Sequence, residues 1–232
     1  MEEFVRTELL IGKDNLEKLN KSKVILFGVG GVGGACLEAL ARSGILNITI
    51  VDADKVAKSN INRQLIATSE VIGMPKVDVA EARVKSICKD INITKLNMFY
   101  LPDNNDIDFS KYDYVIDCID TISAKIDIVK RCYELNIPII SCMGMGNKLN
   151  PLDIRITDIN KTTICPLARV MRYELRKRGV KKLKVCYSIE EPKKPVEEIV
   201  ENGKVIPASI SFVPPVAGYI IASEVIKDLI KE

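Results

Sequence analysis

The stretch from Val24 to Lys76 decides the fold. It reads VILFGVGGVGGACLEALARSG from residue 24, ITIVDAD from residue 48, SNINRQ from residue 59 and GMPK from residue 73. Val24–Phe27 is an apolar run that stops at a glycine, as buried parallel strands often do. Helix formers with apolar spacing follow from Ala35 to Arg42. A strand, a glycine turn and a helix in this order predict the first unit of a parallel α/β sheet.

The turn between strand and helix carries the pattern G-x-G-x-x-G with one additional glycine: Gly28, Gly30, Gly31 and Gly33. Such glycines let a phosphate approach bare backbone N–H groups, and the start of the helix adds positive potential. The second apolar run, Ile48–Val51, ends at Asp52. Asp52 follows Gly33 by about 20 residues, the distance at which an acid of a dinucleotide fold binds ribose hydroxyls. These features predict a nucleotide site and leave NAD open.

Polar residues after the second strand favour a triphosphate over NAD. Asn60, Arg63 and Gln64 come soon after that strand, and Lys76 closes the GMPK segment. An arginine and a lysine would neutralise the β- and γ-phosphates and the leaving pyrophosphate. Beside a dinucleotide the same charges would be surplus, so we expect ATP.

Taken together, G-x-G-G-x-G, D-x-D, N-x-x-R-Q and G-x-x-K resemble the ubiquitin-activating-enzyme superfamily of the ThiF, MoeB and HesA type. Members of that superfamily use ATP to adenylate a carboxylate. The resemblance implies that Asp52 holds the ribose and that Arg63, Gln64 and Lys76 hold the triphosphate. It adds Asp54 and Asn60 to the nucleotide site. It also implies a homodimer in which Arg6 reaches the partner's ATP, although Arg6 could equally be an ordinary exposed arginine.

Asp120 follows a predicted buried strand, Tyr112–Ile119. Ligands of doubly wound sheets bind beyond the carboxyl ends of strands, where Asp120 could ligate Mg²⁺ between phosphate oxygens. The resemblance assigns it the same role, so the predicted catalytic residues are Arg63, Lys76, Asp120 and Arg6. Asp117 is expected to be a helix-capping or structural acid. Thr121 stands where most carboxylate-adenylating relatives have Asn, but it can still cap the following helix.

The length of 232 residues indicates one domain, or one domain with an appendage, and the resemblance implies a single adenylating domain over residues 1–232. The chain is 47% hydrophobic, which is enough to form a core. Its net charge of only +3 does not by itself indicate a nucleic-acid partner. The acidic start, Met1–Glu3, excludes a signal peptide, and Phe212–Ile226 is too short and too interrupted to span a membrane. We therefore expect a cytoplasmic protein without a membrane partner.

Seven cysteines form no C-x-x-C pair, and the chain has no histidine. A structural zinc site is therefore not expected. The absence of histidine also excludes Ser-His and Cys-His catalysis. Cys165 lies where superfamily members can carry a thioester-forming cysteine, and its participation is left open, as is a monovalent cation near Gly144–Gly146.

Periodicity predicts the rest of a Rossmann-like, doubly wound, mainly parallel α/β sheet with a mixed-strand C-terminal extension over residues 143–232. Residues 1–20 form a helical lead-in, and residues 190–204 form a mobile loop. The expected helices are Lys76–Lys89, Ser123–Asn136, Thr162–Arg178 and Val216–Ile230. The further expected strands are Leu96–Leu101, Ile137–Cys142, Asp153–Asp158, Leu183–Ile189 and Ile206–Val213.

The acceptor substrate is suggested by a basic stretch. Arg169–Lys184 holds eight basic residues and one acid. Such clustering favours phosphate binding even when the net charge is small, although a solvated helix face remains the alternative. The predicted tRNA-binding residues are Arg169, Arg172, Arg176, Lys177, Arg178, Lys181 and Lys182.

Within the superfamily, GNKL at residue 146, CPLARV at residue 165 and SFVPPVAG at residue 211 resemble the tRNA threonylcarbamoyladenosine dehydratase (TcdA, also called CsdL) group. The resemblance implies ATP-dependent cyclisation of that tRNA base through an acyl-adenylate, and leaves open a sulfur-transfer partner of the cysteine desulfurase type. Adenylation of a ubiquitin-like sulfur carrier is the alternative. A further alternative is an NAD-binding protein or a non-catalytic nucleotide sensor.

Overall fold

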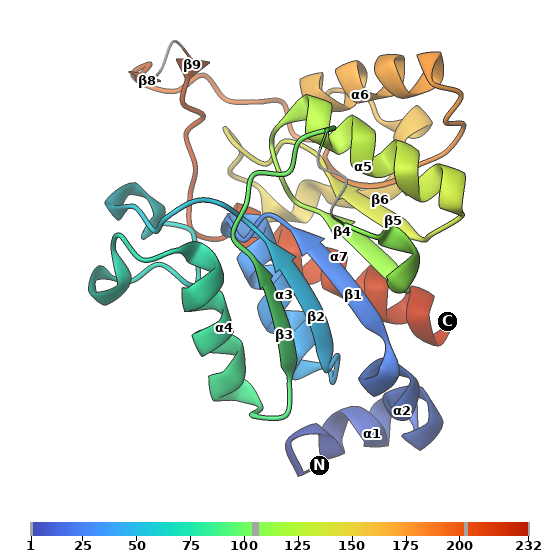
Figure 1. The fold of residues 1–232 in the computed structure, drawn as a ribbon. Helices are drawn as coiled ribbons and strands as arrows, with labels where there is room; N and C mark the ends of the chain where they lie inside the picture. Colours follow the sequence, from blue (N-terminus) through green and yellow to red (C-terminus); the bar gives the residue numbers. More distant parts are fainter. Residues whose placement is uncertain (1, 104–106, 202–203, 232) are drawn as a thin grey trace.

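A seven-stranded sheet runs through the centre of the computed structural model, which describes residues 2–103, 107–201 and 204–231 (Figure 1). The strand order is β3-β2-β1-β4-β5-β7-β6. Neighbouring strands are parallel except β6, which pairs antiparallel with β7. The strands are β1 Lys23–Phe27, β2 Asn47–Val51, β3 Asn92–Leu96, β4 Tyr114–Asp117, β5 Ile139–Cys142, β6 Ile154–Asp158 and β7 Lys184–Ser188. The expected doubly wound sheet with a mixed C-terminal part is confirmed.

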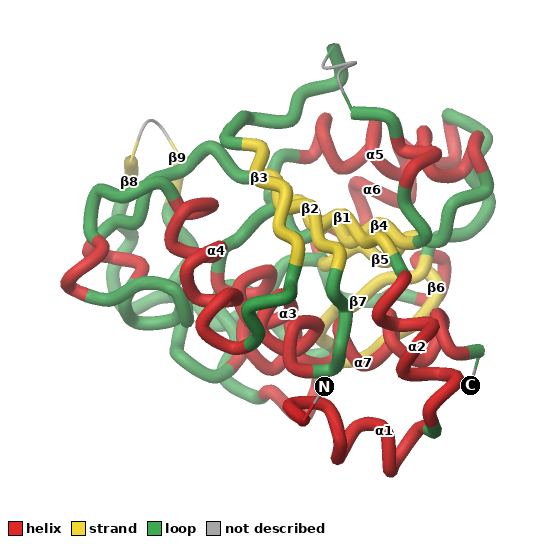
Figure 2. The backbone as a smooth tube through the Cα atoms, turned by 60° about the horizontal axis from the view of Figure 1, so that its bottom comes forward, coloured by secondary structure: helices red, strands yellow, loops and turns green. Residues whose placement is uncertain are grey.

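Helices cover both faces of the sheet (Figure 2). Helices α3, α4 and α7 lie on one face, and α5 and α6 lie on the other. The helices are α1 Val5–Ile11, α2 Lys13–Lys21, α3 Gly31–Arg42, α4 Lys76–Ile87, α5 Ile122–Leu135, α6 Pro166–Lys177 and α7 Val213–Ile230. Each face has its own apolar cluster: one lies beneath α3 and α7, and two lie beneath α5 and α6.

The third strand differs from the expectation. It covers Asn92–Leu96 rather than Leu96–Leu101. This strand is at the edge of the sheet, and exposed Asn92, Thr94 and Lys95 are tolerated there because an edge strand has solvent on one side. The apolar residues that suggested a strand come after it, where Tyr100 turns into the core beside Phe27 with a ring-centroid distance of 5.0 Å.

The expected strand over Ile206–Val213 is wrong. Residues 206–212 contain no strand, and α7 already begins at Val213, ahead of the two prolines in its first turn. This segment is held by single contacts instead of a ladder: Asn147 N–H donates to the Ala208 carbonyl, and Ala208 N–H donates to Asn147 Oδ1, both at 2.7 Å. Part of the expected loop 190–204 forms a short hairpin, β8 Val200–Glu201 with β9 Lys204–Val205, and residues 202–203 lie outside the described residues.

The helical lead-in consists of two helices that meet at Gly12, whose φ of +83° allows the sharp change of direction. Phe4, Leu16 and Leu19 are buried, whereas Leu9 and Leu10 are exposed. In Figure 1 these helices lie at the amino ends of the parallel strands, away from the carboxyl ends. None of the helices in the described part of the chain combines the length and the apolar character that a membrane span requires.

Candidate active site

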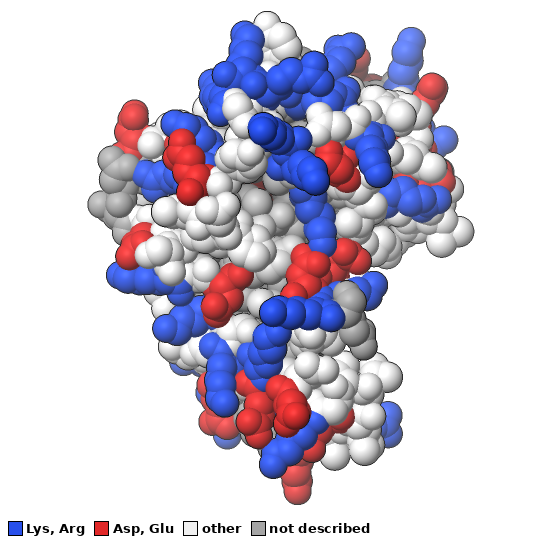
Figure 3. Space-filling view, turned by 90° about the vertical axis from the view of Figure 1, so that its right-hand side faces the viewer, with Lys and Arg blue, Asp and Glu red and all other residues white. Residues whose placement is uncertain are grey.

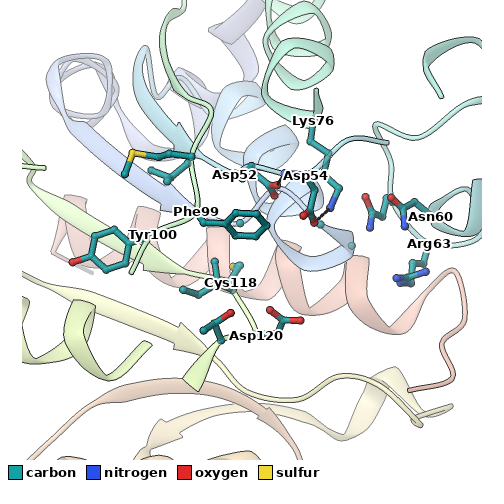
Figure 4. A pocket seen from close by; sticks show the side chains of 18 residues that line it. Asp52, Asp54, Asn60, Arg63, Lys76, Phe99, Tyr100, Cys118 and Asp120 are labelled. Atoms are coloured by element: carbon teal, nitrogen blue, oxygen red, sulfur yellow. Dashed lines mark hydrogen bonds and ion pairs between the residues drawn. The ribbon is translucent and has the colours of Figure 1, made fainter. Parts of the chain in front are cut away.

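A cavity of about 310 Å³ opens at the carboxyl ends of β1, β2 and β4 (Figure 4). This is the place where the chain, having reached the edge at β3, returns to the other side of β1 to form β4. Such a switch point leaves a crevice between neighbouring strand ends. Ten of the predicted nucleotide-site residues line the cavity: Gly28, Gly30, Gly31, Asp52, Asp54, Asn60, Arg63, Gln64, Lys76 and Asp120.

The glycine turn allows no side chain at two of its positions. A Cβ atom on Gly33 would lie 1.8 Å from the Gly28 carbonyl oxygen, and one on Gly28 would lie 2.9 Å from the Cys118 carbonyl oxygen. Gly30 is different, because its nearest neighbour would be Gln64 Nε2 at 3.9 Å. The turn is therefore closed towards the protein and open towards the cavity, directly before α3 begins at Gly31. Backbone N–H groups at such a helix start favour an anion.

Asp52 connects the second strand to this turn, and Asp54 and Lys76 form an ion pair at the same cavity. Asp52 accepts hydrogen bonds from Val29 N–H at 2.7 Å and from Asp54 N–H at 2.8 Å. Asp54 Oδ2 lies 2.7 Å from Lys76 Nζ, and the lysine side chain is buried. Asp52 therefore helps to shape the glycine turn, and the Lys76 ammonium is held at the cavity wall by an exposed acid.

The segment after β2 supplies three polar side chains from a tight turn. The Asn60 carbonyl accepts from the backbone N–H groups of Arg63 at 3.1 Å and Gln64 at 2.9 Å, and Asn60 Oδ1 accepts from Ala57 N–H. Gln64 is buried, and among the described residues its Oε1 has no hydrogen-bond partner. Because buried polar atoms are normally paired, the Gln64 amide is suited to contact a bound ligand.

The fourth strand ends in two acids with different surroundings. Asp117 is fully buried and pairs with Lys125 at 2.9 Å, which confirms the expected structural acid. Asp120 is exposed and lines the cavity, across from Asp52 in Figure 4. Thr121 occupies the position that precedes α5, but its side chain makes no capping hydrogen bond.

Met98, Phe99 and Tyr100 also line the cavity, and the sequence interpretation missed them. Phe99 is 68% exposed and lies among Asp52, Asp54 and Cys118 in Figure 4. Burial, and then a hydrogen bond to Asp127, raise the pKa of Tyr100, so its hydroxyl stays protonated. Their place in the sequence could have revealed them, because residues that directly follow a parallel strand lie at the carboxyl edge of the sheet, where ligands bind. The misplaced strand over 96–101 concealed it.

Two predicted residues, Gly33 and Arg6, lie elsewhere, and so does Cys165, whose participation was left open. Gly33 sits beneath the turn, and Arg6 belongs to α1 at the opposite end of the sheet. Cys165 is buried at the start of α6, where its sulfur accepts from Ala168 N–H at 3.5 Å, and it does not line the cavity. Within the described ranges, no group of three or more His, Cys, Asp or Glu side chains could hold a metal ion.

The basic stretch forms a surface around α6. Lys and Arg side chains gather over this end of the molecule in Figure 3. Arg169, Arg176, Lys181 and Lys182 are exposed. The other three predicted residues have internal partners: Arg172 donates to the carbonyls of Ile159 and Thr162, and Lys177 and Arg178 pair with Glu174.

Comparisons with known proteins agree with this fold. The model of the ThiF family matches residues 5–232. The Bacillus subtilis tRNA threonylcarbamoyladenosine dehydratase is 44% identical over 245 residues, which cover all of this chain and 96% of the relative. The crystal structure of Escherichia coli tRNA N6-threonylcarbamoyladenosine dehydratase, TcdA, in complex with ATP superposes with a TM-score of 0.89 at 28% identity, covering 99% of this chain and 94% of that chain.

A relative of the other predicted class matches a smaller part. The Escherichia coli sulfur carrier protein ThiS adenylyltransferase is 33% identical over 141 residues, or 60% of this chain and 56% of the relative. The family model extends over almost the whole chain. The chain belongs to the ThiF family.

Proposed function

We propose that this protein is an ATP-dependent tRNA threonylcarbamoyladenosine dehydratase that cyclises the modified base through a carboxyl-adenylate. The observation that carries the proposal is the convergence of the glycine turn, Arg63, Lys76 and Asp120 on one cavity. Full-length similarity to the Bacillus subtilis dehydratase supports this choice of acceptor.

In this proposal the cavity holds ATP between the strand ends. The open backbone at Gly30 and the start of α3 receive phosphate oxygens. Asp52, which keeps lone pairs free beyond its two backbone bonds, accepts from the ribose hydroxyls. The Lys76 ammonium, which pairs with Asp54, also contacts the phosphates. Asn60, Arg63 and Gln64 complete the triphosphate site from the neighbouring turn.

The donor set fits a magnesium ion that arrives with ATP. Mg²⁺ usually takes one or two protein carboxylates and fills its other positions with phosphate oxygens and waters. Asp120 supplies one exposed carboxylate at the cavity, which meets that requirement. When bound, the ion would neutralise charge on the phosphates.

The chain's own groups then act mainly by electrostatics. The threonyl carboxylate attacks the α-phosphorus, pyrophosphate leaves, and Arg63 and Lys76 stabilise the negative charge that develops. A nucleophilic atom of the neighbouring carbamoyl group attacks the activated carbonyl and releases AMP. This step is intramolecular, so proximity supplies much of its rate and no enzyme nucleophile is needed. The buried position of Cys165 outside the cavity supports this scheme.

The exposed cations around α6 are proposed to bind tRNA phosphates. Arg169, Arg176, Lys181 and Lys182 are exposed, and so are Lys177 and Arg178. Lys177 and Arg178 contribute more weakly because they share Glu174, and Arg172 supports the turn before the helix. We also propose a homodimer, because the family resemblance implies that Arg6 reaches a partner's ATP, and α1, which carries Arg6, lies at the far end of the sheet from its own cavity. A sulfur-transfer partner and a cytoplasmic location stay predictions.

One incubation tests the proposal. Purified protein, Mg²⁺-ATP and tRNA carrying threonylcarbamoyladenosine are mixed, and the digested nucleosides are weighed by mass spectrometry. We expect an ATP-dependent loss of one water from the modified nucleoside. Arg63→Ala and Asp120→Ala should each slow this by about 100-fold or more, the typical cost of losing a group that stabilises transition-state charge.

Asp90→Ala is the matched control, since Asp90 is exposed beyond α4 and outside the cavity. Its rate should equal that of the wild type. An unchanged nucleoside mass, together with adenylation of a sulfur-carrier C-terminus, would refute the dehydratase and favour the alternative that the ThiS adenylyltransferase similarity suggests.

A further inference from the structure

A fully buried ion pair lies beneath the cavity and joins β4 to α5. Lys125 Nζ is 2.9 Å from Asp117 Oδ2, and neither side chain has exposed surface. Ser141 of β5 donates its hydroxyl to the same Asp117 oxygen at 2.5 Å. Buried ion pairs generally stabilise a protein no better than well-packed apolar residues. The position of this pair therefore suggests a role other than stability.

The pair holds the backbone that precedes Asp120. Ile119 N–H donates to Asp117 Oδ1 at 3.3 Å, and Lys125 Nζ donates to the Ile119 carbonyl at 3.0 Å. Ile119 is thus fastened through both of its backbone groups, by two side chains that are themselves paired. Asp120 is the next residue, so its carboxylate is carried on a fixed support.

The same segment packs directly against the glycine turn. A Cβ atom on Gly28 would lie 2.9 Å from the Cys118 carbonyl oxygen and 3.1 Å from the Ile119 side chain. The turn limits this segment from one side, and the buried pair holds it from the other. A movement of Cys118 and Ile119 would therefore change the distance between the Asp120 carboxylate and the glycine turn.

We propose that Lys125 is a positioning residue of the nucleotide site, which acts through Asp117 and the Ile119 carbonyl to hold Asp120 where it meets the metal and the phosphates. This inference rests on the proposed function. Groups that orient a carboxylate ligand typically change metal affinity or activity by about 10–100-fold when they are removed. Lys125 touches neither the cavity nor the reacting atoms, so its effect is indirect.

The test uses the double variant Asp117→Asn/Lys125→Met. The introduced amide can accept from Ile119 N–H through its oxygen and donate to the Ser141 hydroxyl through its nitrogen. The introduced thioether side chain fills the lysine's volume, so that no single uncompensated charge is left buried. The single variant Lys125→Met is measured beside it, and circular dichroism and thermal melting establish that each variant folds. Two quantities are then compared: the affinity for AMP in EDTA, and the Mg²⁺ concentration that gives half of the thermal stabilisation by a non-hydrolysable ATP analogue.

We expect the AMP affinity of the double variant to lie within about twofold of the wild-type value. The Mg²⁺ concentration that gives half of the stabilisation should rise by about tenfold or more. The control is Tyr114→Phe, which removes the 2.5 Å hydrogen bond to Asp228 at the opposite end of β4. This control should lower the melting temperature without changing the Mg²⁺ requirement.

A double variant with the wild-type Mg²⁺ requirement would overturn the positioning role. Equal losses in AMP binding and in Mg²⁺ dependence would also overturn it, because the pair would then support the whole pocket. A wild-type protein that binds neither AMP nor the ATP analogue would instead refute the proposed function.

Discussion

At the residue scale, Glu38 is a buried acid in an otherwise apolar stretch of α3. Its carboxylate accepts three hydrogen bonds of 2.8 Å, one from Arg42 and two from Arg83 of α4. Burial by itself would raise the pKa of Glu38, but the hydrogen bonds and charges of the two arginines lower it below its ordinary value of 4.5. The ionised form is therefore favoured by folding.

Glu38→Gln should therefore be destabilising in a pH-dependent way. Since the folded pKa is depressed, the contribution of Glu38 is complete above pH 4.5 and is lost as the pH falls through the folded pKa. At pH 7 we expect a loss of about 1.5–3 kcal/mol in the free energy of unfolding, the usual worth of hydrogen bonds to a charged group. Urea denaturation at pH 7 and at about pH 3 measures the difference, which should shrink in acid.

The control for this prediction is Glu17→Gln, whose side chain is half exposed and pairs with Lys13 and Lys21 at 3.9 and 3.7 Å. Exposed pairs of this kind contribute little, so the control should change stability by less than about 1 kcal/mol at either pH. A Glu38→Gln loss that stays constant from neutral to acid pH would show that packing, rather than ionisation, accounts for it.

At the scale of elements, the packing of α3 against α7 depends on Gly218. A Cβ atom at this position would lie 2.2 Å from the Val32 carbonyl oxygen and 2.8 Å from Ala35 Cβ. Both of these atoms belong to α3, whose first turn faces the cavity. The close approach therefore fixes the helix that carries the glycine turn, and a helix-forming residue at 218 cannot replace the glycine.

Gly218→Ala should lower the free energy of unfolding by about 1–3 kcal/mol, because overpacking pushes the two helices apart. Gly34→Ala is the matched control in α3, where the nearest atom to a new Cβ would be the Val29 carbonyl oxygen at 4.0 Å. Because alanine has a higher helix propensity than glycine, Gly34→Ala should leave the free energy of unfolding unchanged or raise it by up to about 1 kcal/mol. Urea denaturation of both variants decides the matter, and two equally stable variants would contradict the close packing.

At the scale of the whole molecule, charge is distributed unevenly although the net charge is only +3. The exposed cations around α6 lie on the opposite face of the sheet from α4, which carries its own exposed Lys85. If tRNA binds over α6, binding must release counterions there and not at α4. The salt dependence of binding therefore distinguishes the two faces.

Arg169→Ala/Arg176→Ala should reduce the slope of log affinity against log salt concentration by about 1.4–1.8, if each arginine neutralises one phosphate. Fluorescence anisotropy of labelled tRNA at several salt concentrations measures this slope. Lys85→Ala/Lys89→Ala removes the same charge from the α4 side and should leave the slope unchanged. Identical slopes for both double variants would refute tRNA binding over α6.

The sequence alone determined β1, β2 and β4, the strands whose carboxyl ends form the nucleotide site. β1, the glycine turn and α3 follow one another directly, and Asp52 and Asp120 each come just after a strand. These signals are local: glycine spacing, apolar runs and the residue that ends a strand are readable without knowing any distant contact. For this reason ten of the predicted nucleotide-site residues meet in one cavity, while their individual roles stay predictions.

Only the tertiary structure decided features that join distant segments. Lys125 reaches back to Ile119 and Asp117 inside the core, Gly218 meets Val32 across two helices, and Phe99 reaches the cavity because β3 ends earlier than its apolar sequence suggested. The sequence had already distinguished Asp117 from Asp120, but only the tertiary structure showed that Asp117 is fully buried and pairs with Lys125. Burial and pairing depend on which elements pack together, and a local pattern carries no information about that choice.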